Sequence, residues 1–192
     1  RALGSDDLAA LTSDQIVALT TAQAASLTTA QVIGLSSDQV AALESADLRA
    51  LSSAALRALG SDQVAGLVTE GIGLLSTAQI AAMGTAQLAT LGSDAIVAMS
   101  SDQIRALGSA QVAALTTAQI AAIETGDLAV MSTAQLRALA SDDIAALTSD
   151  QIVALSTAQT ASLSSTQVPG LSSDQLGAME SDDLRALSTV SL

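Results

Sequence analysis

The sequence predicts an all-α fold, a solenoid in which each repeat is a single short helix. Three observations predict it. The chain repeats every eight residues, with twenty-three full octads between Gly4 and Leu187 and no insertion or deletion. Ser or Thr stands at the second position of each octad, and aliphatic residues dominate the fifth and eighth. Such a strict period is typical of repeat architectures, so we expect residues 1–192 to form one continuous solenoid, a segment of a longer array.

The length of the repeat excludes a long helix. Eight residues turn an α-helix through about 800°, so an apolar stripe would drift by roughly 80° per octad. In a strand, positions 5 and 8 would point to opposite faces, and Ala and Gln are poor strand formers. A β-solenoid remains an alternative, but a helix interrupted once per octad fits the pattern better.

Each position of the octad has an expected part in this helix. The hydroxyl at position 2 is expected to be the N-cap, with Asp at positions 3 and 4 in the first turn, where the helix dipole favours acidic side chains. Where position 1 is also Ser or Thr, the pattern T-x-x-Q predicts a capping box that begins one residue earlier. Position 1 is expected to end the preceding helix, often with glycine, as at Gly4, Gly60, Gly84, Gly92 and Gly108.

A helical wheel predicts which positions face inward. With position 8 at the centre of the inner face, positions 5 and 7 flank it, position 4 lies near the interior, and positions 3 and 6 face water. All six Arg residues stand at position 6, and position 7 is nearly always small. We expect three octads to close one coil of 24 residues, giving a triangular prism; a four-sided coil of 32 residues is the alternative.

The octad TTAQIAAI at residues 116–123 gives the general phrase [TS]-[TS]-[AD]-Q-[IV]-x-A-[LM]. This phrase resembles the octapeptide arrays of very long bacterial repeat proteins, and the resemblance covers the whole chain. It implies a part of a secreted or cell-surface protein. No catalytic or binding residue is attached to the repeat in that resemblance.

The composition restricts the chemistry that the chain can perform. His, Cys, Lys and aromatic residues are absent, so there is no imidazole base, thiolate or stacking platform for nucleic-acid bases. The net charge of −13 repels phosphate groups, and polar residues return in every octad, so we expect neither a nucleic-acid partner nor insertion into a membrane. We predict that the chain is not an enzyme, with no catalytic, cofactor-binding or metal-binding residues and no cofactor.

The recurrent polar side chains have structural interpretations. Gln at position 4 is expected to satisfy backbone groups at a corner or in the next coil, with a row of ligand-binding amides as the alternative. Acidic pairs are expected to be solvated charges rather than calcium ligands; they occur at Asp6–Asp7, Asp142–Asp143 and Asp182–Asp183. Arg49 and Arg185 are expected to pair locally with the acidic residues of their own octads, which include Glu44, Asp47, Glu180 and Asp183.

Two octads depart from the pattern. VTEGIGLL at residues 68–75 carries Val68 at the polar corner and Leu74 in the small slot, so we expect a coil that is locally forced apart or a helix that swings. Pro169, at position 6 of its octad, is expected to distort or weaken that helix because it lacks an N–H group.

Taken together, these features predict a structural rod: a stalk, fibre or filament body of a bacterial extracellular or surface assembly. The expected partners are copies of the chain joined end to end, or further repeats of the same chain, and other surface proteins or glycans. A repeat scaffold that binds a protein or carbohydrate, and an ice-binding rod, are the alternative functions.

Overall fold

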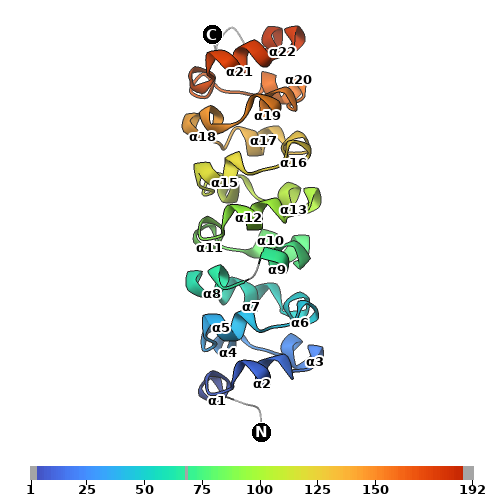
Figure 1. Ribbon diagram of the computed structural model, residues 1–192, viewed down its shortest axis with the longest axis vertical. Coiled ribbons are helices and arrows are strands. Elements are labelled where there is room, and N and C mark those ends of the chain that lie inside the picture. Colours follow the sequence, from blue (N-terminus) through green and yellow to red (C-terminus); the bar gives the residue numbers. More distant parts are fainter. Residues whose placement is uncertain (1–3, 68, 188–192) are drawn as a thin grey trace. The chain divides into compact units, whose positions relative to one another are not determined.

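The computed structural model describes residues 4–67 and 69–187, and these residues form short helices without a strand. The all-α solenoid predicted from the sequence is confirmed. The chain divides into two compact units, Arg1–Met99 and Ser100–Leu192. The first unit is coloured blue to green in Figure 1 and the second green to red.

Each full octad of the described chain carries one helix. In the first unit the helices are α1 (Ser5–Ala9), α2 (Ser13–Val17), α3 (Thr21–Ala25), α4 (Thr29–Ile33), α5 (Ser37–Ala41), α6 (Ser45–Ala50), α7 (Ser53–Ala58), α8 (Ser61–Ala65), α9 (Thr69–Leu74), α10 (Thr77–Ala82), α11 (Thr85–Ala89) and α12 (Ser93–Val97). In the second unit they are α13 (Ser101–Ala106), α14 (Ser109–Val112), α15 (Thr117–Ala121), α16 (Thr125–Ala129), α17 (Thr133–Leu136), α18 (Ser141–Ala146), α19 (Ser149–Val153), α20 (Thr157–Ala161), the 3-10 helix η1 (Val168–Gly170), α21 (Ser173–Ala178) and α22 (Ser181–Ala186).

Every α-helix whose N-cap the structure describes has position 1 of the octad as that N-cap, so the expectation that position 2 caps the helix is wrong. Thr116, for example, has extended backbone angles, and its hydroxyl accepts from the N–H of Gln119 at 3.3 Å. The side chain of Gln119 in turn accepts from the Thr116 N–H at 2.7 Å. This reciprocal pair is the capping box that T-x-x-Q predicts, and it outweighs a position-2 cap because it satisfies two backbone donors at once.

Glycine at position 1 does not end a helix in a left-handed conformation. Gly60 has φ −70° and ψ 161°, and Gly108 has φ −73° and ψ 155°, which are extended angles open to any residue. Among the described residues no φ is positive. The correction follows from the octad's length, because an extended N-cap residue turns the chain at once into the next helix.

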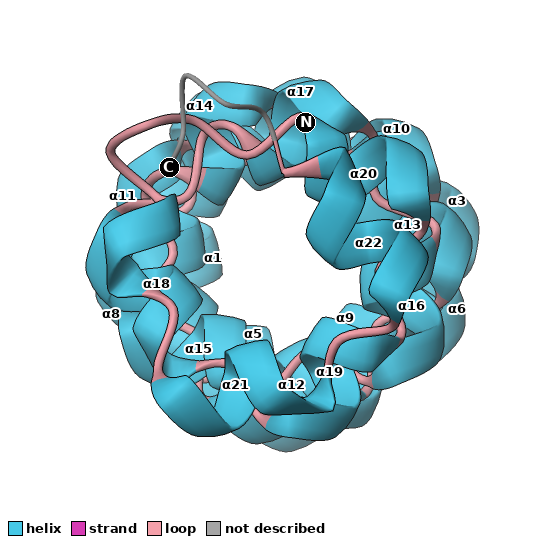
Figure 2. Cartoon of the chain, turned by 90° about the horizontal axis from the view of Figure 1, so that it is seen from above, coloured by secondary structure: helices cyan, strands magenta, loops and turns pink. Residues whose placement is uncertain are grey.

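Within each unit, a helix packs against the helix three octads further on, as α3 does with α6 and α6 with α9. Packing three octads apart would suit a coil of 24 residues. Hydrogen bonds between coils, however, join residues that are 25 to 31 positions apart in the sequence, among them Arg49 Nε to Leu74 O and Gln39 Nε2 to Leu8 O. One coil is therefore longer than 24 residues and shorter than 32, and neither predicted polygon is correct. Figure 2 agrees, since α3, α6 and α9 follow one another around the wall instead of superimposing.

Positions 5 and 8 form the core of each unit, with position 4 beside them. Ile104 and Leu128, both at position 5, are 0% exposed, whereas Leu107 at position 8 is 4% exposed. The wheel placed position 8 at the centre of the inner face, but position 5 is the more deeply buried. The wheel had no means of fixing the tilt of each helix, which the contacts with the next coil determine.

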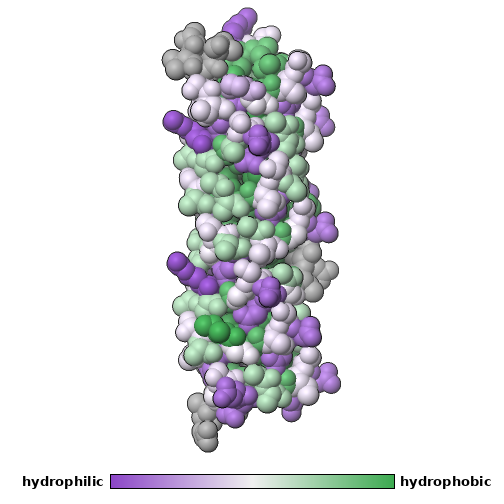
Figure 3. All heavy atoms as spheres, turned by 90° about the vertical axis from the view of Figure 1, so that its left-hand side faces the viewer, coloured by the Kyte–Doolittle hydropathy of each residue, from purple (hydrophilic) through white to green (hydrophobic). Residues whose placement is uncertain are grey.

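The outward-facing positions agree with the wheel. Arg49, Arg105 and Arg137 are exposed at position 6, and position 3 is exposed in octads throughout both units. Exposed aliphatic residues also occur at position 6, including Ile33, which is 60% exposed. On the face drawn in Figure 3, hydrophilic and hydrophobic side chains alternate in small groups.

Position 7 is small because it faces the preceding coil. A Cβ on Gly66 would lie 3.1 Å from the carbonyl oxygen of Ser37, and one on Gly34 would lie 3.3 Å from that of Ser5. In both pairs, position 7 of one octad meets position 2 of the octad three before it. The close approach that the sequence predicted for this position is confirmed.

The irregular octad at residues 68–75 still forms a helix, α9. Val68 lies outside the described residues. Leu74 is half-buried, and its carbonyl oxygen accepts from Arg49 Nε at 3.1 Å. Gly73 approaches the next coil so closely that a Cβ would lie 2.6 Å from the carbonyl oxygen of Ala98. Glycine therefore allows close packing at this octad, so the expectation that the coils are forced apart here is wrong; the alternative, a helix that swings, stays a prediction.

Pro169 distorts its octad as predicted, because the octad holds the 3-10 helix η1 and no α-helix. Pro169→Ala restores the missing N–H donor, so we expect the free energy of unfolding to rise by about 1 kcal/mol. Urea denaturation followed by circular dichroism at 222 nm measures it. Pro169→Gly also regains the N–H donor but has a low helix propensity, so comparing it with Pro169→Ala separates the two contributions. A lower urea midpoint than the wild type for both variants would contradict the expectation.

Candidate functional site

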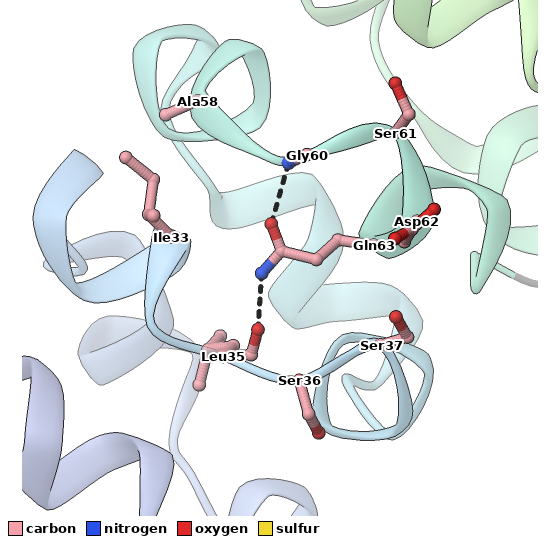
Figure 4. Close-up of a pocket in the computed structure, with 9 residues that line it drawn as sticks. All are labelled: Ile33, Leu35, Ser36, Ser37, Ala58, Gly60, Ser61, Asp62 and Gln63. Carbon is pink, nitrogen blue, oxygen red and sulfur yellow. Dashed lines mark hydrogen bonds between the residues drawn. The ribbon is translucent and has the colours of Figure 1, made fainter.

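The most regular polar feature of the molecule is the glutamine at position 4, illustrated by Gln63 in Figure 4. Its side-chain oxygen accepts from the backbone N–H of Gly60 at 2.7 Å, which completes the start of α8. Its side-chain nitrogen donates to the carbonyl oxygens of Leu35 and Val32, the latter at 2.9 Å. One amide therefore caps its own helix and also holds the preceding coil.

The same arrangement recurs through both units, and we call it the glutamine clamp. In each case the side-chain nitrogen donates to backbone carbonyl oxygens of the octad four before it, at residues 28 to 31 positions earlier. Glutamines with this pattern include Gln39, Gln63, Gln79, Gln87, Gln135, Gln151, Gln159, Gln167 and Gln175.

The clamp explains why Gln is the commonest residue at this position of the octad. Position 4 is the third residue of the helix, from which a side chain reaches back to the N-cap N–H, as in a capping box. Glu could do the same, but only an amide also supplies a donor for the carbonyl groups of another coil. The prediction that Gln satisfies backbone groups at the corner and in the next coil is confirmed.

The clamp is incomplete in the first octads. Gln15 and Gln23 are exposed, although each side-chain oxygen accepts from its own N-cap N–H, at 2.9 and 2.8 Å. Gln39, one octad beyond the first coil, is only 4% exposed and donates to Leu8 and Leu11. The amide is therefore buried only where a preceding coil covers it.

Aspartate replaces Gln at five position-4 sites, and four of these residues are buried. Asp47 is 1% exposed and Asp143 is 6% exposed, so the interpretation as solvated charges is wrong for the four buried aspartates, whereas Asp7 at position 4 is exposed. It holds for Asp6, Asp142 and Asp182 at position 3, which are exposed. The sequence signal that was missed is the register, because position 4 faces inward wherever a preceding coil covers it.

Two of the buried aspartates accept from a hydroxyl of another coil. Thr117 Oγ1 donates to Asp143 Oδ1 at 3.0 Å, and Ser101 Oγ donates to Asp127 Oδ1 at 2.5 Å. Both hydroxyl residues stand at position 2, three octads before the aspartate that they contact. The hydroxyl at position 2 does not cap the helix and can therefore donate a hydrogen bond to another coil.

The predicted local pairing is confirmed for Arg185, which pairs with Asp182 of its own octad at 2.9 Å. Arg49 instead donates to Leu74 O at 3.1 Å. Arg105 makes a local pair with Asp102 at 3.3 Å. Both aspartates stand at position 3, three residues before the arginine on the exposed face, whereas position 4 points inward. These exposed pairs contribute little to stability.

The described residues contain no group of three or more His, Cys, Asp or Glu side chains placed to hold a metal ion. Nor do they contain a helix with the length and apolar character of a membrane span.

Comparison with known proteins gives one family. No curated protein matches the chain. The family model described as the ALTTAQ repeat matches residues 1–21, 16–45, 40–77, 69–101, 96–122 and 120–157. The matches tile most of the chain at the register of the octads, and the glutamine clamp uses the Gln of that phrase. The chain is a repeat protein with solenoid-like helical repeats, and it belongs to the ALTTAQ repeat family.

Proposed function

We propose that the chain is a structural scaffold, the body of a stalk, fibre or filament in a bacterial extracellular or surface assembly, and that it has no catalytic activity. The observation that carries the proposal is the glutamine clamp. The most regular polar side chain of the repeat binds the preceding coil, and the two aliphatic positions fill the core. Stability in such a fold grows with the number of stacked repeats, which suits a load-bearing element.

The proposed partner is another coil of the same kind, from a second copy of the chain or from further octads. Two features support it. The amides of Gln15 and Gln23 are exposed on the first coil and match those that bind carbonyl groups elsewhere. On the last coil, Leu184 at inner position 5 is 40% exposed, while its counterpart Ile144 is 0% exposed. A coil stacked on either surface would bury the same groups that the interior buries.

The association of purified chains tests this proposal. Sedimentation velocity over a concentration series is expected to show reversible end-to-end association. Leu184→Asp places a charge in the stacking surface and is expected to reduce the association by at least about tenfold, because a buried unpaired charge is unfavourable. Ile33→Asp, on the outer wall, is the matched control and should have no effect.

The outcomes distinguish the possible contacts. Monomers at every concentration would refute end-to-end association of this chain. If Ile33→Asp abolished the association and Leu184→Asp did not, the contact would lie between outer walls. The proposed surface location is tested separately, by protease treatment of intact cells; protection of the chain from the protease would contradict it.

A further inference from the structure

Asp47 is the most deeply buried acidic residue that the structure describes, and it differs from the other buried aspartates in its contacts. It stands at position 4 on α6 and is 1% exposed. Its Oδ2 atom is buried and has no hydrogen-bond partner. A buried carboxylate without a partner is strongly unfavourable, so this atom requires a ligand or a proton.

The register of the clamp identifies what lies opposite Asp47. Gln79 donates to Leu48 O at 3.0 Å and Leu51 O at 2.9 Å, which are 31 and 28 residues before it. The same separations place Asp47 opposite the carbonyl groups of Ile16 and Leu19. In a Gln octad the amide would donate to these oxygens, but a carboxylate has no hydrogen to donate.

The register also assigns a hydroxyl to this position. Thr117 Oγ1 lies 3.0 Å from Asp143 Oδ1, and the two residues are 26 positions apart. Counting 26 residues back from Asp47 gives Thr21, also at position 2 of its octad. The separations therefore assign one carboxylate, one hydroxyl and two backbone carbonyl groups to this position, all of them oxygen ligands.

We propose that Asp47, Thr21 and the carbonyl oxygens of Ile16 and Leu19 bind a hard cation, either Ca²⁺ or Na⁺, between two coils of the first unit. Both ions take carboxylate, hydroxyl and carbonyl oxygens as ligands. The cation neutralises the buried carboxylate and takes the place of the amide hydrogens in joining the coils. Thr21 is exposed, so water can complete the coordination from that side.

The experiment compares thermal stability of the full chain in CaCl₂, NaCl and tetramethylammonium chloride at equal ionic strength. The tetramethylammonium ion is too large for a gap between packed coils. We expect the wild-type midpoint to rise by about 2–5 °C in the salt of the bound cation. Which of the two salts acts identifies the ion.

Two variants make the test specific. Asp47→Gln introduces the commonest residue of this position, whose amide can donate to both carbonyl groups, so the protein should fold and lose the cation-dependent shift. Asp14→Gln removes one exposed charge at position 3 and should retain the shift. Equal midpoints in all three salts, or a shift that survives Asp47→Gln, would overturn the proposal. So would stabilisation by acid alone, abolished by Asp47→Gln, because it would identify a proton as the ligand.

Discussion

Replacing Gln135 by alanine is expected to lower the free energy of unfolding by about 2–4 kcal/mol. We expect this to be the largest effect of replacing any buried polar side chain of the repeat. The Gln135 amide nitrogen donates to Ile104 O and Leu107 O, both at 2.9 Å. Its oxygen accepts from the Ser132 N–H at 2.8 Å. Truncation leaves two buried acceptors and one capping donor without this side chain, and it opens a space between two coils.

Gln23→Ala is the matched control. Gln23 makes the same local bonds, accepting from the Thr20 N–H at 2.8 Å and the Thr20 hydroxyl at 2.9 Å, but it is exposed. We expect a loss of about 0.5–1 kcal/mol for Gln23→Ala, which is the value of the cap alone. The difference between the two variants measures the bonds between coils, and equal losses would show that the clamp stabilises only its own helix.

Gln135→Glu tests the donor separately. The substitution keeps the capping oxygen but directs a carboxylate at two carbonyl oxygens, so ionisation is disfavoured in the folded state and the pKa of the new group is raised. A raised folded-state pKa gives stability that is present below the unfolded value of about 4.3 and is lost as the pH rises. We therefore expect Gln135→Glu to be more stable at pH 4 than at pH 7, relative to the wild type.

The chain has no aromatic residue, so intrinsic fluorescence cannot report unfolding. Circular dichroism at 222 nm is the suitable global probe, and amide hydrogen exchange resolves individual coils. Local measurements matter because solenoids open repeat by repeat. For Gln135→Ala, exchange should accelerate first in the coils that contain α13 and α17.

Gly170→Ala is expected to destabilise the second unit by about 1–3 kcal/mol, because a Cβ at this position would overlap the carbonyl group of Ser141. The contact is with backbone, so a side-chain rotation cannot relieve it. The neighbouring coil must shift, which also disturbs the core beneath. The change in urea midpoint, measured by circular dichroism, checks this value.

Gly177→Ala, in the next octad, is expected to stabilise the protein, which is the opposite of the effect expected for Gly170→Ala. Gly177 lies within α21, and a Cβ there would meet nothing within 4 Å. Removing a glycine from a helix interior should stabilise the protein by about 0.5–1 kcal/mol. If both alanine variants changed stability in the same direction, the close approach at Gly170 would not be the cause.

The sequence alone predicted the elements of this protein and the direction in which most side chains face. Strict eight-residue spacing excludes a continuous helix, and T-x-x-Q carries its own capping geometry, so one short helix per octad follows from local physics. The exposure of Arg105 and the closeness of Gly66 to the preceding coil also follow, because a helical wheel separates positions 6 and 7.

Three features depended on the tertiary structure. The length of a coil, between 24 and 32 residues, is set by how helices and clamps of separate octads meet, and a period of eight contains no information about it. The hydroxyls at positions 1 and 2 are both possible N-caps, and the reach of the Gln side chain selects the one at position 1. The burial of Asp47 could not be predicted from the sequence, because a charged residue is normally exposed. Packing against the adjacent coil places position 4 in the interior.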